Sequence, residues 1–265
     1  ALTAASRDRL EALTWWFPIV GRVPYLGFFD KDDGIARRDK LAAEGYDTEL
    51  RGVPAFSTLG WFADPIFSSM LTLPDTVLVN TIIHELTHAT LFVPGDVEFN
   101  ENLATFVGNR GAVDFFVERD GPASPRARRV LDDQADAQRF GAFMRRMIDG
   151  LTAYYASGAS REEKIAGRER EFDHWRRRFT TEVVPELRGD RYGGFADASL
   201  NNAVILSLGA YYRDLGLFDR AYEVCGRDLP RLVRALVGLA RAQKGAMAAG
   251  LEKDVESGAL CSSGP

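Results

Sequence analysis

Two short segments carry the residues best suited to chemistry: HELTH at residues 84–88 and NENLAT at residues 100–105. His84 and His88 are four residues apart, so on a helix they lie one turn apart on the same face. Each could then offer one nitrogen to a single ion. The chain has only 3 histidines, so two of them in this frame, with a glutamate after the first, form a specific signal. The pattern predicts half of a zinc site.

The second segment is expected to supply a third ligand. A proline and a glycine at 94–95 end the first helix, and Asp96 can begin a second one. On that second helix Glu101, Ala104 and Gly108 share one face. The small side chains at the last two positions would let the two helices pack closely. The predicted metal ligands, for one Zn²⁺ per chain, are His84, His88 and Glu101.

Three protein ligands leave a fourth position on zinc for water, whose pKa falls to about 7. Glu85 follows the first histidine but is rotated off the ligand face. It could accept a proton from that water during attack on a carbonyl and pass it to a leaving amine. The alternative is that His84 and His88 are ordinary surface or core histidines and that Glu85 is a solvated charge. The complete set of residues favours a metal-dependent hydrolase.

These segments resemble the zincin metallopeptidases, and within them the glutamate-zincins, whose third ligand lies in an Asn-Glu-x-x-Ala segment. The chain is more similar still to a bacterial family of predicted aminopeptidases. That similarity extends to residues 23–29 (VPYLGFF), 52–65 (GVPAFSTLGWFADP) and 200–203 (LNNA). The resemblance implies a zincin-like fold, a peptide substrate and cleavage at the peptide N-terminus. Residues 89–100, between the second and third ligands, are fewer than in the better-known glutamate-zincins, so we expect a tight connection there.

In zincins an edge strand above the metal helix holds the substrate backbone in extended form. The resemblance places residues 57–62 in that role, with a glycine that permits close backbone approach. The alternative is an ordinary buried turn with aromatic packing. The substrate-binding residues predicted in this segment are Thr58, Leu59, Gly60 and Trp61.

Polar residues interrupt an otherwise apolar helix expected to end at Tyr212, and polar groups buried there would need partners. Peptide hydrolysis needs a donor for the oxyanion of the tetrahedral intermediate, commonly a Tyr or a His from a distant segment. Tyr211 is the first candidate for this role and Tyr192 the second. Asn201 and Asn202 are candidate substrate-binding residues. The alternative is that all of these residues cap and pack.

An aminopeptidase must also recognise a free ammonium group, usually with a carboxylate near the metal. Asp64, Asp96 and Glu98 are available, and the sequence does not select one of them. A zinc metalloendopeptidase is the alternative within the same chemistry. A non-catalytic zincin-fold module that binds peptides is the alternative from another class. Glu85 argues against that module, because binding alone needs no proton acceptor.

Composition and charge restrict the function classes. The chain has 265 residues, 46% of them hydrophobic, and a net charge of −5, which argues against nucleic-acid binding. The sequence shows no apolar run long enough to span a membrane and no signal peptide, and it does not indicate an oligomeric state. Cys225 and Cys261 are expected to be free, with a disulfide that fastens the C-terminal tail as the alternative. The resemblance implies the bacterial cell envelope or periplasm, often with a lipid anchor; the cytoplasm is the alternative.

The expected fold class is α+β and predominantly helical, with a zincin-like fold. We expect a single domain over residues 1–265, with an N-terminal α/β lobe containing a small mixed sheet (1–74), a metal-binding helix pair (75–120) and a helical lobe (121–265). Helices are expected over 6–17, 31–45, 75–93, from 96 onward, over 123–155, 160–187 and from 197 or 199 to 212, with a helical pair over 219–251, a strand over 46–53 and a flexible tail after 257.

Overall fold

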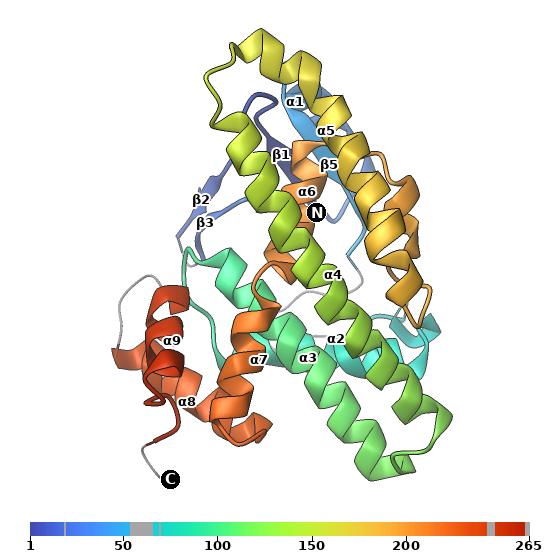
Figure 1. Ribbon diagram of the computed structural model, residues 1–265, viewed down its shortest axis with the longest axis vertical. Helices are drawn as coiled ribbons and strands as arrows, with labels where there is room; N and C mark the ends of the chain where they lie inside the picture. The colour runs from blue at the N-terminus through green and yellow to red at the C-terminus, as the bar shows by residue number, and fades with distance from the viewer. Residues whose placement is uncertain (19, 54–65, 69, 243–246, 263–265) are drawn as a thin grey trace. The chain divides into compact units, whose positions relative to one another are not determined.

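The computed structural model describes residues 1–18, 20–53, 66–68, 70–242 and 247–262 (Figure 1). The protein is predominantly helical with a small N-terminal sheet, as expected. The chain forms two compact units. The sheet unit contains Ala1–Val53 and Arg139–Arg213, and the hairpin unit contains Pro54–Gln138 and Asp214–Pro265. These boundaries do not coincide with the lobe boundaries expected at residues 74 and 120, and the expectation of a single domain stays a prediction.

Among the described residues of the sheet unit, five short strands form two antiparallel sheets. β1 (Leu2–Ala5) lies between β4 (Tyr25–Leu26) and β5 (Asp47–Leu50). β2 (Trp15–Phe17) and β3 (Gly21–Val23) form a separate hairpin. All residues of β1 are buried, so it is the centre of the sheet. The expectation of a mixed sheet was wrong for the described strands, since every pairing among them is antiparallel, whereas the strand expected within residues 46–53 is confirmed.

The helix expected over residues 6–17 was wrong. In place of helical hydrogen bonds, the Leu13 amide donates to the Ala4 carbonyl (2.8 Å), and the Ser6 amide donates to the Glu11 carbonyl (3.0 Å). Leu13 packs on the small core formed by Leu2, Ala4 and Leu41. The apolar spacing that suggested a helix therefore comes from a folded-back loop and β2, both of which face β1.

The helices of the sheet unit begin with strong capping signals. α1 (Lys31–Ala43) begins after Asp30, whose side chain accepts hydrogen bonds from two amides of the first turn. α5 (Arg161–Glu182) begins with a complete capping box between Ser160 and Glu163. The remaining elements of this unit are the second part of α4 (Pro125–Tyr155), the 3₁₀ turns η2 (Val184–Glu186) and η3 (Gly193–Asp197), and α6 (Asn202–Tyr212).

Aromatic side chains fill the space between α4, α5 and η3. Phe143 and Phe179 are fully buried, with ring centroids 5.2 Å apart. Phe195 contacts both rings, at 5.7 Å and 4.9 Å. These contacts place an apolar core of the sheet unit between the two long helices and η3.

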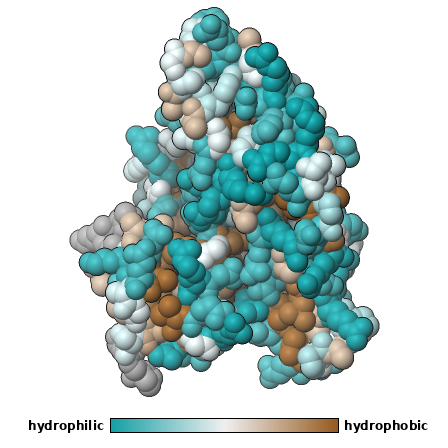
Figure 2. All heavy atoms as spheres, in the orientation of Figure 1, coloured by the Kyte–Doolittle hydropathy of each residue, from teal (hydrophilic) through white to brown (hydrophobic). Residues whose placement is uncertain are grey.

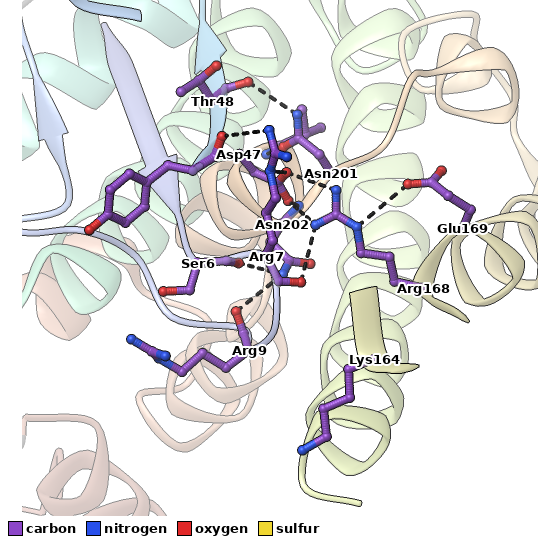
Figure 3. A network of polar contacts seen from close by, with 12 residues as sticks. Ser6, Arg7, Arg9, Asp47, Thr48, Lys164, Arg168, Glu169, Asn201 and Asn202 are labelled. Carbon is purple, nitrogen blue, oxygen red and sulfur yellow. Dashed lines mark hydrogen bonds and ion pairs between the residues drawn. The ribbon is translucent and has the colours of Figure 1, made fainter. Parts of the chain in front are cut away.

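A buried carboxylate connects three elements of the sheet unit (Figure 3). Asp47 of β5 accepts two hydrogen bonds from the guanidinium group of Arg168 on α5, at 2.6 Å and 2.9 Å. It also accepts one from the backbone amide of Asn202 at the start of α6, at 3.0 Å. The side chains of Asp47 and Arg168 are only 4% and 10% exposed. This bidentate pair fixes where α5 and α6 lie against the sheet.

The hairpin unit is helical throughout its described part. It contains η1 (Met70–Thr72), α2 (Asp75–Thr90), α3 (Val97–Asp120), the first part of α4, α7 (Leu215–Val224), α8 (Leu229–Ala242) and α9 (Met247–Glu256). α2 and α3 lie side by side, joined by a short connection (Figure 1). The pair of helices expected over 219–251 is in fact three helices. The turn at Gly226, with a φ of 74°, separates the first two.

The C-terminal segment is attached rather than free. Cys225, directly after α7, forms a disulfide with Cys261, so the expectation of free thiols was wrong. Leu260 and Cys261 are also buried, at 9% and 5% exposure. The flexible tail expected after residue 257 is therefore wrong at least as far as Cys261.

The surface is largely hydrophilic on the face drawn in Figure 2. Among the described residues, none of the helices combines the length and apolar character required to cross a bilayer. The sequence-based expectation of no spanning segment agrees with this finding for that part of the chain.

We predict that Arg168→Met lowers the free energy of unfolding by about 3 to 5 kcal/mol, because it leaves the buried Asp47 carboxylate without its bidentate partner. Urea denaturation followed by circular dichroism measures this change. Arg178→Met is the matched control, since Arg178 pairs with Glu182 on the exposed face of the same helix and its loss should have little effect. Equal effects of the two substitutions would contradict the role given to the buried pair.

Candidate metal centre

Residues 84–88 (HELTH) lie on α2. This segment forms a helix because its apolar positions repeat with helical spacing and its ends are well defined. Pro74 is the N-cap residue of the helix, which has no side-chain cap hydrogen bond. Asp75 lies in the first turn, where a negative charge is favourable. Val79 packs against the core formed by Ala112, Val113 and Phe116 of α3, together with two residues of α4. This packing holds α2 against α3.

α3 begins as predicted. Asp96 is its N-cap, and the Asp96 side chain accepts a hydrogen bond from the Phe99 amide at 3.1 Å. Gly108 lies where α3 is closest to α2. A Cβ atom at this position would lie 3.1 Å from the Asn80 carbonyl oxygen and 3.4 Å from the His84 Cβ. The expectation that a small residue here permits close packing of the two helices is confirmed.

The three predicted ligands come together in this interface. The Nε2 atoms of His84 and His88 are 3.2 Å apart. The Glu101 Oε2 atom lies 3.4 Å from the first nitrogen and 3.7 Å from the second. Bonds of about 2.0 to 2.1 Å to a tetrahedral zinc ion place neighbouring ligand atoms about 3.3 Å apart. All three separations are close to this value, so one ion fits between the three atoms.

Burial and hydrogen bonding also fit a metal. Glu101 and His88 are each 8% exposed. The Glu101 Oε2 atom is buried and receives no standard hydrogen bond from any described residue, although both imidazoles face it. Buried polar atoms rarely lack a partner. Within the described part of the chain, no other group of His, Cys, Asp and Glu side chains converges in this way.

Electrostatic interactions within the cluster favour the charged forms of Glu101 and His88, although burial opposes these forms. Burial opposes ionisation of Glu101, but its interactions with the side chains and charges of His84 and His88 lower its pKa to about 2. Burial likewise lowers the pKa of His88, but Glu101, together with the charge of Glu85, outweighs burial and raises that pKa. A metal cation bound between the three side chains would replace the histidine protons as the positive charge beside the Glu101 carboxylate.

Two asparagines hold the segment around the candidate ligand Glu101 in place, and the sequence did not predict their roles. Asn100 is 2% exposed and makes two hydrogen bonds with the backbone of Val93, at 2.9 Å and 2.8 Å. Asn102 is fully buried. Its side chain donates to the Glu98 carbonyl and accepts from the Asp214 amide, both at 2.9 Å. These contacts fix the first turn of α3, from which Glu101 projects.

Comparison with known proteins identifies the family. The sequence model of a family described as "Putative aminopeptidase" matches residues 1–251. The chain belongs to this family. No curated protein and no solved structure matches the chain significantly. Membership in the aminopeptidase family agrees with peptidase activity, and the match covers most of both units.

The structure brings His84, His88 and Glu101 together, and each of the other described site residues predicted for this member of the family belongs to one of the two units. Glu85 is half-buried on α2, between the two histidines. Tyr211 and Tyr192 belong to the sheet unit. There the Arg51 guanidinium lies 4.7 Å from the ring centroid of Tyr211, and Tyr192 stacks on Phe140 at 4.8 Å. Catalytic roles for the two tyrosines stay predictions. Thr58, Leu59, Gly60, Trp61 and Asp64 lie outside the described residues.

Asn201 and Asn202 have structural contacts in the sheet unit. Asn201 caps α6 by accepting a hydrogen bond from the Val204 amide at 2.9 Å. Asn202 is fully buried; its side chain donates to the Ser6 carbonyl at 2.8 Å and accepts from the Tyr155 hydroxyl at 2.9 Å. These contacts fit the alternative that both residues cap and pack. Substrate binding by either residue stays a prediction.

We predict that Gly108→Leu destabilises the protein by about 1 to 3 kcal/mol, because its side chain must push α2 away from α3. Gly238→Leu is the matched control. Gly238 is an exposed glycine of α8 with open space around its Cβ position, so the substitution there should be neutral or slightly stabilising. Thermal unfolding of both variants tests this. A Gly108→Leu variant as stable as the control would contradict close packing at this point.

Proposed function

We propose that this chain is a zinc-dependent aminopeptidase, with His84, His88 and Glu101 as the metal ligands. The observation that carries the proposal is the convergence of two imidazole nitrogens and one carboxylate oxygen at the spacing of a tetrahedral site. Family membership supports the peptidase part of the proposal. The ligand types favour zinc, because two imidazoles and one carboxylate with an open position are typical of catalytic zinc in hydrolases.

When bound, the ion would lower the pKa of a water molecule and polarise the scissile carbonyl. Glu85 is the proposed general base and acid. It follows the first ligand on α2, and its charge contributes to the raised pKa of His88, which supports its proximity to the centre. From there the Glu85 carboxylate would accept a proton from the attacking water and deliver it to the leaving amine. Tyr211 remains our candidate donor to the oxyanion, with Tyr192 as the second candidate.

Among the carboxylates considered for the substrate ammonium group, Asp96 is already engaged in capping α3. Glu98 lies one turn before Glu101 on the same helix, on a neighbouring part of its surface. Asp96 and Glu98 are the two described candidates for recognition of a free N-terminus.

The disulfide between Cys225 and Cys261 supports a location outside the cytoplasm, because disulfides persist in oxidising compartments. We therefore propose the bacterial cell envelope or periplasm, as the resemblance implies. Cytoplasmic action would require the protein to function with this bond reduced.

We predict that purified parent protein contains about one zinc per chain, that His88→Ala loses it, and that Glu85→Gln keeps it. Turnover of an aminoacyl substrate should fall by two or more orders of magnitude in Glu85→Gln, because the variant keeps the metal but has no base. Elemental analysis and a kinetic assay give the two readouts. His174→Ala is the control, since this exposed third histidine lies outside the cluster. A Glu85→Gln variant with parental turnover would overturn the role given to Glu85, whereas a zinc-loaded parent without any turnover would favour a peptide-binding role without catalysis.

We further predict that a peptide with a free N-terminus is cleaved from that end, whereas its N-acetylated form resists cleavage. The reason is that acetylation removes the ammonium charge that an aminopeptidase must recognise. Mass spectrometry of the products distinguishes the cases. Internal cleavage of the acetylated peptide would show that the chain is a metalloendopeptidase instead.

A further inference from the structure

A pair of asparagines crosses the interface between α2 and α3, away from the ligands. The Asn80 side chain donates a hydrogen bond from Nδ2 to the Oδ1 atom of Asn109, at 2.8 Å. Asn109 is 8% exposed and Asn80 is half-buried. The pair is therefore a side-chain contact inside a helix interface, where two apolar residues would ordinarily pack.

The sequence positions of the pair relate it directly to the ligands. Asn80 precedes His84 by one turn and His88 by two turns, so all three side chains share one face of α2. Asn109 follows Glu101 by eight residues, which again places both on one face of α3. Because a short connection makes α2 and α3 a helical hairpin, one interface contains both the asparagine pair and the ligands.

The pair also lies where the two helices are closest. The backbone oxygen and the Oδ1 atom of Asn80 lie 3.1 Å and 3.3 Å from the position a Cβ would take on Gly108, the residue before Asn109. The hydrogen bond between Asn80 and Asn109 requires a particular distance and angle between the two side chains, so it forms in one register of α2 against α3. Sliding α3 by a single residue, about 1.5 Å along its axis, would break it. Apolar side chains tolerate such slippage better, and a buried polar residue is a known device for specifying helix register.

We propose that Asn80 and Asn109 are positioning residues for the metal centre: their hydrogen bond sets the register of α2 against α3. Register decides the separations between the Glu101 oxygen and the two histidine nitrogens, now 3.4 Å and 3.7 Å. Supporting contacts beyond the ligands themselves commonly change metal affinity by about 10-fold to 100-fold. This inference rests on the proposed function, since it concerns the same metal centre.

The test replaces both partners, so that no buried amide is left unpaired. The variant Asn80→Leu/Asn109→Leu is expected to bind Zn²⁺ at least about tenfold more weakly than the parent in a chelator competition. With Co²⁺ as the probe, its visible absorption spectrum should differ from that of the parent, because the ligand geometry has changed. The single variant Asn109→Asp keeps an acceptor for the Asn80 side chain. It is therefore expected to retain the Zn²⁺ affinity and the Co²⁺ spectrum of the parent.

Gln138→Leu is the matched control. Its amide donates to Asp219 at 2.9 Å and connects α4 to α7 in the same unit, without contact with the ligands. This variant should bind Zn²⁺ like the parent. The single variant Asn109→Ala provides a second test if the double variant does not fold, and its affinity should fall in the same direction.

The outcomes separate the two proposals. A parent that binds Zn²⁺ tightly, with an Asn80→Leu/Asn109→Leu variant within twofold of it and an unchanged Co²⁺ spectrum, would overturn the positioning role alone. Equal losses in Gln138→Leu would also overturn it, since the effect would then be one of general stability. A parent that binds no metal would overturn the proposed function and this inference with it.

Discussion

Close contact between α2 and α3 is the constraint on which the candidate centre depends. Imidazole and carboxylate side chains have short reach, so ligands on two helices meet at one point only if the helices are close together. Gly108 permits this closeness, because any side chain there would contact the Asn80 carbonyl and the His84 side chain. The ligand atoms of His84, His88 and Glu101 converge as a consequence.

Buried polar groups give both units their specific arrangement. Asp47 pairs with Arg168 in the sheet unit, and Asn100 and Asn102 bond to backbone groups in the hairpin unit. Such groups contribute little net stability, but an arrangement that leaves them without partners is strongly disfavoured. Apolar and aromatic packing, as around Phe143, supplies most of the stabilisation, while the polar groups select one packing over its neighbours.

The C-terminal helices are connected to the centre through α3. The amide of Asp214, at the start of α7, bonds to Asn102, next to the ligand Glu101. The other end of α7 leads to Cys225 and hence, through the disulfide, to Cys261. The start of α7 therefore contacts α3 of the helical hairpin, and its other end is joined to the C-terminal segment by the disulfide. The family match, which spans residues 1–251, includes these helices as well as the sheet unit.

The sequence by itself determined the elements whose geometry is local. Residues four apart share a helix face whatever surrounds them, so HELTH predicted two converging imidazoles. The flanking proline and glycine predicted the turn between α2 and α3, although α2 ends at Thr90, before the expected residue 93. Glu101 could be predicted too, because only a short connection separates α3 from α2. Most of the long helices followed from apolar spacing in the same way.

Only the tertiary structure decided what depends on distant partners. Residues 6–17 were expected to form a helix, but a hydrogen bond from Leu13 to Ala4 of β1 and the pairing of β2 with β3 hold them as a loop and a strand. The buried partner of Asn202 was not predictable from the sequence, because its side chain bonds to the Ser6 carbonyl, 196 positions away. The disulfide joins cysteines 36 residues apart. No local pattern encodes such pairings, because they arise only when packing brings separate segments together and buried polar groups must then find partners.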